Sequence, residues 1–113
     1  MATFDELKEQ AEQEISEQGR SLASDDTAFV EQAADLLAAL RLWADTRQRS
    51  EADVREVIDT ENATLLKHLA TELAGSGGDD ALEASRRLEA IAYASSDRVS
   101  EIFDLAQKTL QSS

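Results

Sequence analysis

The only histidine in the chain, His68, is the first residue whose chemistry has to be considered. Glu72 follows it by one helical turn and Glu61 precedes it by two, so a helix would bring the three side chains to one side. Imidazole and carboxylate groups together can bind divalent metals. A carboxylate-bridged di-metal site in a helical bundle needs Glu-x-x-His, however, and the residue at that spacing is Leu65. We therefore interpret His68 and Glu72 as a surface pair and predict no metal and no cofactor.

Nucleophilic and acid–base catalysis have little support in the sequence. The chain has no cysteine, and no Gly-x-Ser-x-Gly element would expose a serine nucleophile. The Gly-Ser-Gly-Gly run lacks the Lys-Ser/Thr pair of a phosphate loop. No two of the 24 acidic residues are placed by the pattern in a shared apolar pocket, which is what separates the pKa values of a catalytic pair. We therefore expect a protein that is not an enzyme.

Regularly spaced carboxylates make the N-terminal segment the first candidate for binding a partner. Asp5, Glu9 and Glu12 recur at steps of four and three residues. On a helix they lie along one face and rise by about 6 and about 4.5 Å, a spacing comparable to that of phosphates along a nucleic-acid strand. Such a row could bind a basic protein surface, or it could occupy the groove in which a basic protein holds nucleic acid.

Trp43 is the second candidate for partner binding. A tryptophan brings a large apolar surface, and its indole N–H needs an acceptor when it is buried. Tryptophan is also enriched among the residues that dominate protein interfaces. Because Trp43 closes a regular apolar stripe, a core position is its first interpretation, with an interface anchor as the alternative.

The net charge narrows the class of partner. The chain has 24 acidic and 11 basic residues, which gives a formal net charge of −13, and residues 1–35 hold ten of the acids and two of the bases. Domains that bind nucleic acid neutralise phosphates with Lys and Arg, so direct binding to nucleic acid is not expected. A charged partner should be basic, although an acidic surface is also a general means of staying in solution.

No segment of the sequence predicts insertion into a membrane or export. Residues 1–10 are acidic where a signal peptide would be basic and then apolar. No apolar run approaches the about 18 residues of a membrane span. We therefore expect a cytoplasmic protein that does not enter the membrane.

Hydrophobic periodicity predicts the helices that position these residues. Segment 27–48 repeats apolar residues at steps of three and four, and other apolar residues widen the stripe on one flank: Phe29, Ala33, Leu36, Leu40 and Trp43, with Val30, Leu37 and Ala44 beside them. A stripe of this width is typical of the central helix of a bundle, which touches two or more neighbours.

The whole pattern predicts an all-α, up-and-down bundle of about four helices that forms a single domain over residues 1–113. The expected helices are an acidic N-terminal one at about 3–22 and three more at about 26–46, 51–74 and 79–110. A Gly-rich joint at 75–78 separates the last two. Ser50 and Asp53 resemble a capping box, although one continuous helix over 26–73 is an alternative. Glu61 or Asn62 falls near the apolar seam, which indicates either an exposed turn or a buried polar contact.

These features favour a non-catalytic protein-interaction module, such as a small acidic adaptor, assembly subunit or inhibitor. One alternative is an acidic nucleic-acid mimic that blocks the basic groove of a nucleic-acid-binding protein. Another is a metal-dependent carboxylate bundle enzyme. The broad central stripe also predicts self-association as a homodimer, and so does the last helix, with its apolar residues and a patch of small ones at Ala92, Ser95 and Ser96.

Overall fold

The computed structural model describes residues 3–17, 27–76 and 78–111. Within these ranges the chain forms six helices and no strand: α1 Phe4–Glu17, α2 Thr27–Thr46, α3 Glu51–Thr60, α4 Ala63–Gly75, α5 Asp79–Ala92 and α6 Ser96–Gln111. The all-α class is confirmed. The expectation of about four helices is wrong, because two of the expected helices are each divided in two. The expected end of the first helix near residue 22 and the side chain of Phe29 lie outside the described residues.

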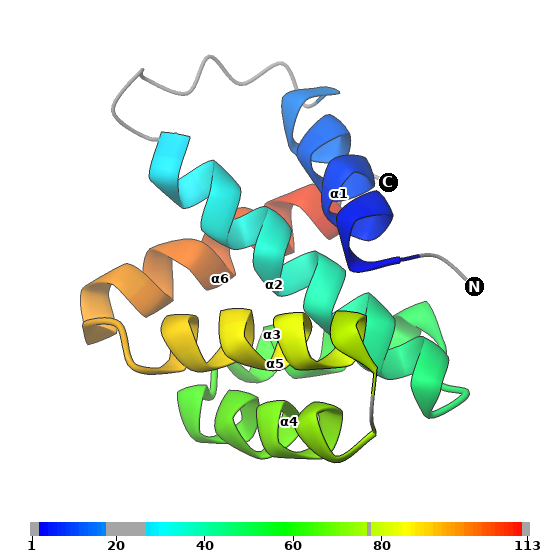
Figure 1. Ribbon diagram of the computed structural model, residues 1–113. Helices are drawn as coiled ribbons and strands as arrows, with labels where there is room; N and C mark the ends of the chain where they lie inside the picture. The colour runs from blue at the N-terminus through cyan, green and yellow to red at the C-terminus, as the bar shows by residue number, and fades with distance from the viewer. Residues whose placement is uncertain (1–2, 18–26, 77, 112–113) are drawn as a thin grey trace.

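Helix α2 is the centre of the fold and packs against α1, α3, α5 and α6. It crosses the molecule between α1 on one side and α5 on the other (Figure 1). Every residue from Ala33 to Leu40 is buried, so over two turns this helix has no exposed side. The alanines among them let neighbouring helices approach closely. The prediction that this segment forms the central helix, with several neighbours, is confirmed.

The predicted break between the second and third helices is confirmed, and a continuous helix over 26–73 is excluded. Helix α2 ends at Thr46 and α3 begins at Glu51. Gln48 has a φ of +56°, and this left-handed conformation turns the chain out of α2. The Ser50 backbone N–H donates to the Asp53 carboxylate at 3.0 Å, which is the reciprocal bond expected of a capping box.

The helix expected at 51–74 is divided at Glu61 and Asn62. Glu61 has a φ of +50° and ends α3. The Asn62 side chain then begins α4 by accepting hydrogen bonds from the N–H of Thr64 at 3.0 Å and of Leu65 at 3.4 Å. Both Glu61 and Asn62 are exposed. The polar gap in the apolar seam is therefore an exposed turn, the first of its two interpretations.

The helix expected at 79–110 is also divided, at residues 93–95. The Ala94 N–H donates to the Ile91 carbonyl at 3.1 Å, which closes α5. The Ser95 hydroxyl accepts from the Arg98 N–H at 3.3 Å, the bond by which a capping serine begins a helix. Apolar spacing continues through both helices, so periodicity does not reveal this break.

Helices α4 and α5 lie side by side below α2 in Figure 1, joined by the Gly-rich segment. Helix α4 ends at Gly75, and Gly78, with a φ of +93°, precedes the first residue of α5. The predicted joint at 75–78 falls at this connection, and Gly77 lies outside the described residues. The buried Ser85 hydroxyl donates to the Ala70 carbonyl at 2.7 Å and fastens the two helices together.

We expect Asn62→Ala to destabilise the protein by about 1 kcal/mol, because the N–H groups at the start of α4 lose their acceptor. The measurement is the free energy of unfolding from urea denaturation. Asn62→Asp is the matched control, since aspartate accepts the same bonds and should keep most of the stability. Equal losses in the two variants would contradict the capping role.

Candidate interaction surface

Helix α1 presents a row of three carboxylates to solvent. Its apolar residues are buried against the rest of the protein: Phe4, Leu7, Ala11 and Ile15. The opposite face of the helix therefore points outward. Asp5, Glu9 and Glu12 lie there and are exposed. We call these three residues the acidic row.

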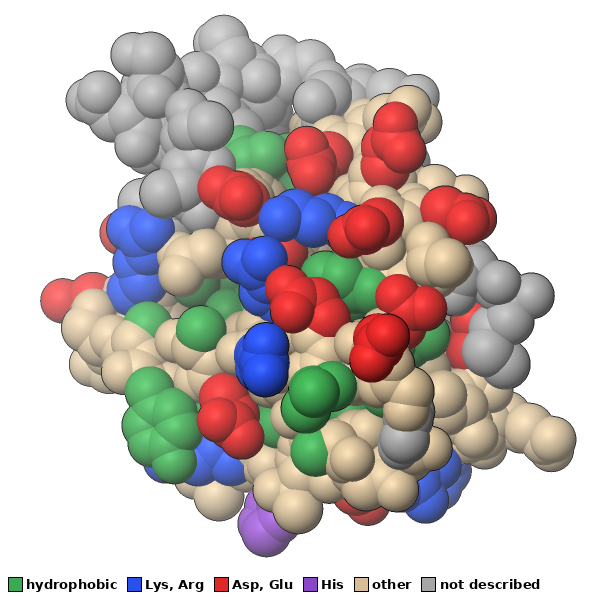
Figure 2. Space-filling view, viewed as in Figure 1, with side chains coloured by type: hydrophobic (Ala, Val, Ile, Leu, Met, Phe, Trp, Pro, Cys, Tyr) green, Lys and Arg blue, Asp and Glu red, His purple; other side chains and the backbone are tan. Residues whose placement is uncertain are grey.

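The acidic row is unpaired within the part of the chain that the structure describes. None of its carboxylates forms an ion pair or a hydrogen bond there. Lys8, the only base in α1, contacts Glu31 and Asp35 of α2 instead. Acidic side chains dominate the surface over α1 (Figure 2). The negative charge of the row is therefore available to interact with solvent or with a partner.

The beginning of α5 brings the carboxylate of Asp80 to the start of α1. The Phe4 N–H donates to Asp80 Oδ1 at 3.3 Å, so the first turns of α1 and α5 lie together. Asp79 and Asp80 are both exposed, and the positive end of the helix dipole favours their charge. From the sequence these two residues are recognisable only as capping residues.

A buried carboxylate in α2, Asp35, ties α1 to the bundle. Asp35 is 4% exposed. Its Oδ1 lies 3.1 Å from Lys8 Nζ of α1, and its Oδ2 lies 3.7 Å from Arg87 Nη1 of α5. One carboxylate thus joins three helices. The sequence gives a single signal of this role, which is a charged residue inside an apolar run.

Burial governs the protonation of this ion cluster. Asp35 Oδ1 has no well-directed hydrogen bond, so the contact with Lys8 is an ion pair without good hydrogen-bond geometry. Burial raises the pKa of Asp35, and the attraction of Lys8 and Arg87 offsets only part of that effect. Burial also acts to lower the pKa of Lys8, but the attraction of Asp35 and Glu31 outweighs it and the pKa of Lys8 is raised. The carboxylate has the larger burial cost because its side chain is 6% exposed, against 17% for Lys8.

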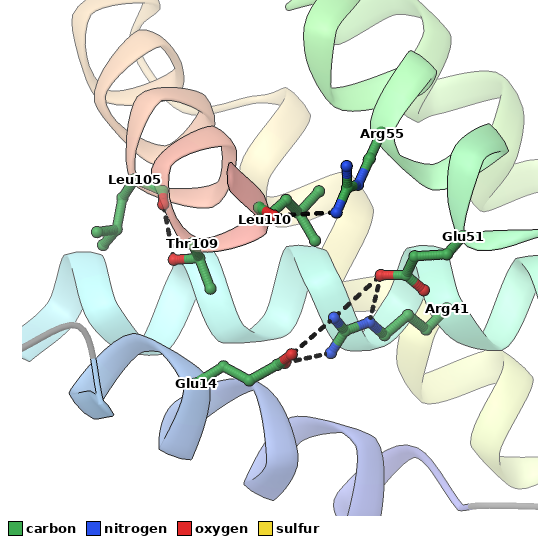
Figure 3. A network of polar contacts seen from close by, with 7 residues as sticks. All are labelled: Glu14, Arg41, Glu51, Arg55, Leu105, Thr109 and Leu110. Atoms are coloured by element: carbon green, nitrogen blue, oxygen red, sulfur yellow. Dashed lines mark hydrogen bonds and ion pairs between the residues drawn. The ribbon is translucent and has the colours of Figure 1, made fainter. Parts of the chain in front are cut away.

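A second ion-pair group, centred on Arg41 of α2, holds α1 at another point. Arg41 Nη2 donates to Glu14 of α1 at 3.1 Å and to Glu51 of α3 at 3.0 Å. Figure 3 shows the guanidinium between the two carboxylates. The planar fork of arginine suits such paired contacts. With Lys8, this contact fixes the orientation of α1 and so the direction in which the acidic row faces.

Trp43 lies in the core and is separate from the acidic row. It is 9% exposed, and its indole N–H donates to Glu72 of α4 at 3.0 Å. The buried N–H thus has the acceptor that a core tryptophan needs. The core interpretation is confirmed, and the structure does not bring Trp43 together with Asp5, Glu9 and Glu12.

His68 lies exposed on α4, and the carboxylate of Glu72 accepts the bond from Trp43. Among the described residues, no three His, Asp or Glu side chains come close enough together to hold a metal ion. In the same ranges, no helix has both the length and the apolar character needed to cross a bilayer.

Comparison of the chain with protein-family models, curated proteins and solved structures gives no significant match.

We expect Asp35→Asn to change how stability depends on pH. Because the pKa of Asp35 is raised in the folded protein, the folded chain binds that proton more tightly than the unfolded chain does. Wild type should therefore lose free energy of unfolding relative to the variant as the pH rises above about 4 toward neutrality. Lys8 stays charged over this range and does not contribute to the change. The measurement is urea denaturation at each pH.

The control is Asp59→Asn, which removes one exposed charge from α3. It should not reproduce the relative loss seen with Asp35→Asn. If wild type instead gains stability over the Asp35→Asn variant as the pH rises, the attraction of Lys8 and Arg87 outweighs the burial of the carboxylate.

We expect Lys8→Met to destabilise the protein by about 2 kcal/mol, because it leaves a buried carboxylate without its nearest cation. Adding Asp35→Leu to this variant should restore most of the loss, since the uncompensated charge is then gone. Urea denaturation of the wild type, the two single variants and the double variant measures the coupling. Additive effects would show that the two side chains do not act as a pair.

Proposed function

We propose that the protein is a non-catalytic interaction module that binds a basic protein partner through the acidic row of α1. The observation that carries the proposal is that Asp5, Glu9 and Glu12 are exposed and, within the described part of the chain, unpaired on a helix whose orientation is fixed. Two ion-pair groups hold α1 in this orientation: that of Asp35 with Lys8 and that of Arg41 with Glu14. The acidic side chains therefore project from a defined backbone.

A fixed row of charge favours both the rate and the strength of binding. Less ordering is needed at the moment of contact when the backbone that carries the charged groups is already in place. The net charge of −13 attracts a basic partner over a distance of about a Debye length, which raises the association rate. Asp80 extends the acidic surface at one end of the row.

The buried polar side chains support a non-catalytic role, since each has a structural contact. In the described ranges these side chains are Asp35, Ser85 and Thr109. Asp35 joins α1 to α5, and Ser85 bonds to the Ala70 carbonyl. The Thr109 hydroxyl donates to the Leu105 carbonyl at 2.8 Å, within α6 (Figure 3).

We expect the combined changes Asp5→Asn, Glu9→Gln and Glu12→Gln to slow association with the partner and to flatten its salt dependence, because they remove the attracting charges. The wild type and the variant serve as baits for proteins in a lysate of the native cells. Captured proteins are identified by mass spectrometry, purified, and measured for association and dissociation rates at several salt concentrations. Affinity for the wild type should fall steeply with salt.

The matched control is Glu56→Gln, Asp59→Asn and Glu101→Gln, which removes one aspartate and two glutamate charges from exposed positions of α3 and α6. This control has the same net charge as the first variant and should bind like wild type. Equal weakening by both sets would show that total charge, and not the row, is recognised. Binding that ignores salt and both sets would contradict the proposal and assign the contact to an apolar surface.

The same experiment shows whether the partner is a nucleic-acid-binding protein whose groove is blocked or a protein bound through another basic surface. The spacing of the acidic row suits a groove that otherwise holds a nucleic-acid strand. If the captured protein binds nucleic acid, DNA or RNA should compete with wild type for it. A partner that binds both at once would use another basic surface, and the protein would then be an adaptor or assembly subunit.

A further inference from the structure

Tyr93 is the most exposed large hydrophobic side chain among the described residues. It is 72% exposed and lies just after α5, at the turn into α6. Lys67 Nζ of α4 lies 4.5 Å from the centre of its ring. This cation–π contact restrains the ring without burying it. The aromatic surface is therefore held outward, as an anchor for a protein interface would be.

A hollow of about 350 Å³ lies beside Tyr93. The two sequence neighbours of Tyr93, Ala92 and Ala94, both line it. The remaining lining is apolar in part and polar in part: Ala63, Val99, Ser96, Ser100 and Glu61. A tyrosine suits such a lining, because its ring is apolar and its hydroxyl needs a polar partner. We call Tyr93, Lys67 and this hollow the turn patch.

The turn patch has the properties of a surface that pairs with itself. A two-fold axis makes each contact twice, so a projecting group beside a hollow of matching chemistry can be exchanged between two copies. The charges agree with this arrangement. Lys67 lies over the projecting ring, and Glu61 lines the hollow that would receive the ring of the other copy. When the Tyr93 ring of one copy enters the hollow of the other, it brings the positive charge of Lys67 toward the negative charge of the other copy's Glu61.

We propose that the turn patch is a homodimer interface in which Tyr93 of each copy enters the hollow of the other and Lys67 pairs with the partner's Glu61. Each chain carries a net charge of −13, so two copies repel one another as whole molecules. Local contacts of opposite charge therefore decide how the copies can approach. The interface is distinct from the acidic row and leaves that row exposed in both copies.

The first test is sedimentation equilibrium of the full chain over low to high micromolar concentrations. Wild type should dimerise, and Tyr93→Ala should weaken the dimer at least about tenfold, as removal of a central interface anchor does. Ser100→Phe, at an exposed position of α6 that lines the hollow, should weaken it similarly by filling the space. Leu82→Ala is the control, since Leu82 is 43% exposed on α5 and does not line the hollow. Circular dichroism verifies that each variant is folded.

The second test separates the proposed pairing from total charge. Glu61→Lys lowers the negative charge of the chain and Lys67→Glu raises it, so an effect of net charge alone would strengthen one dimer and weaken the other. The proposed pairing predicts that each single change weakens the dimer, because it places like charges together, and that the double change restores most of it, because the exchanged charges are again opposite across the interface. A wild type that stays monomeric, or a dimer that ignores Tyr93→Ala and the charge exchange, overturns the proposal. The proposed binding through the acidic row is unaffected by either result.

Discussion

Burial of the middle of α2 on every side, over residues 33–40, is the constraint on which the rest of the fold depends. In a simple bundle of four long helices, each helix touches its neighbours and keeps one face toward solvent. Residues Ala33–Leu40 have no such face. Covering them requires neighbours from several directions, and shorter helices that change direction supply them. The left-handed residues Gln48 and Glu61 and the turn before Ser95 are the places where the chain changes direction around this centre.

The charged Asp35 inside this buried helix sets the position of α1. Its carboxylate is covered by Lys8 from one helix and Arg87 from another, so these helices cannot slide along α2 without leaving a buried charge uncompensated. An apolar residue would pack with less cost but would accept several positions of α1. The cluster therefore favours the arrangement in which the outward face of α1 is defined.

Much of the fold can be predicted from the sequence, and the reasons for the failures are physical. Apolar periodicity reveals the central helix and the inward face of α1, and from that face the exposure of the acidic row follows. The turn at Ser95 is missed because the apolar steps continue across it. The turn at Glu61 shows in the sequence as a polar gap in the apolar seam, which indicates either an exposed turn or a buried polar contact, and the capping residue Asn62 is the local signal that favours the turn. The burial of Asp35 is not predictable, since it depends on α1 and α5 covering a side of α2 that the pattern alone would leave exposed. The hollow beside Tyr93 is missed for the same reason, because helices distant in sequence form it.

The buried face and the exposed face of α1 are under different structural constraints. The inward set is constrained by packing and by the ion pairs beneath it. The outward set, Asp5, Glu9 and Glu12, has no contact of that kind within the described chain. Substitution on the outer face is therefore nearly free of consequences for folding. Among descendants of this chain the inner face would change slowly and preserve the architecture, while the outer face could diverge rapidly and follow whatever surface it has to match.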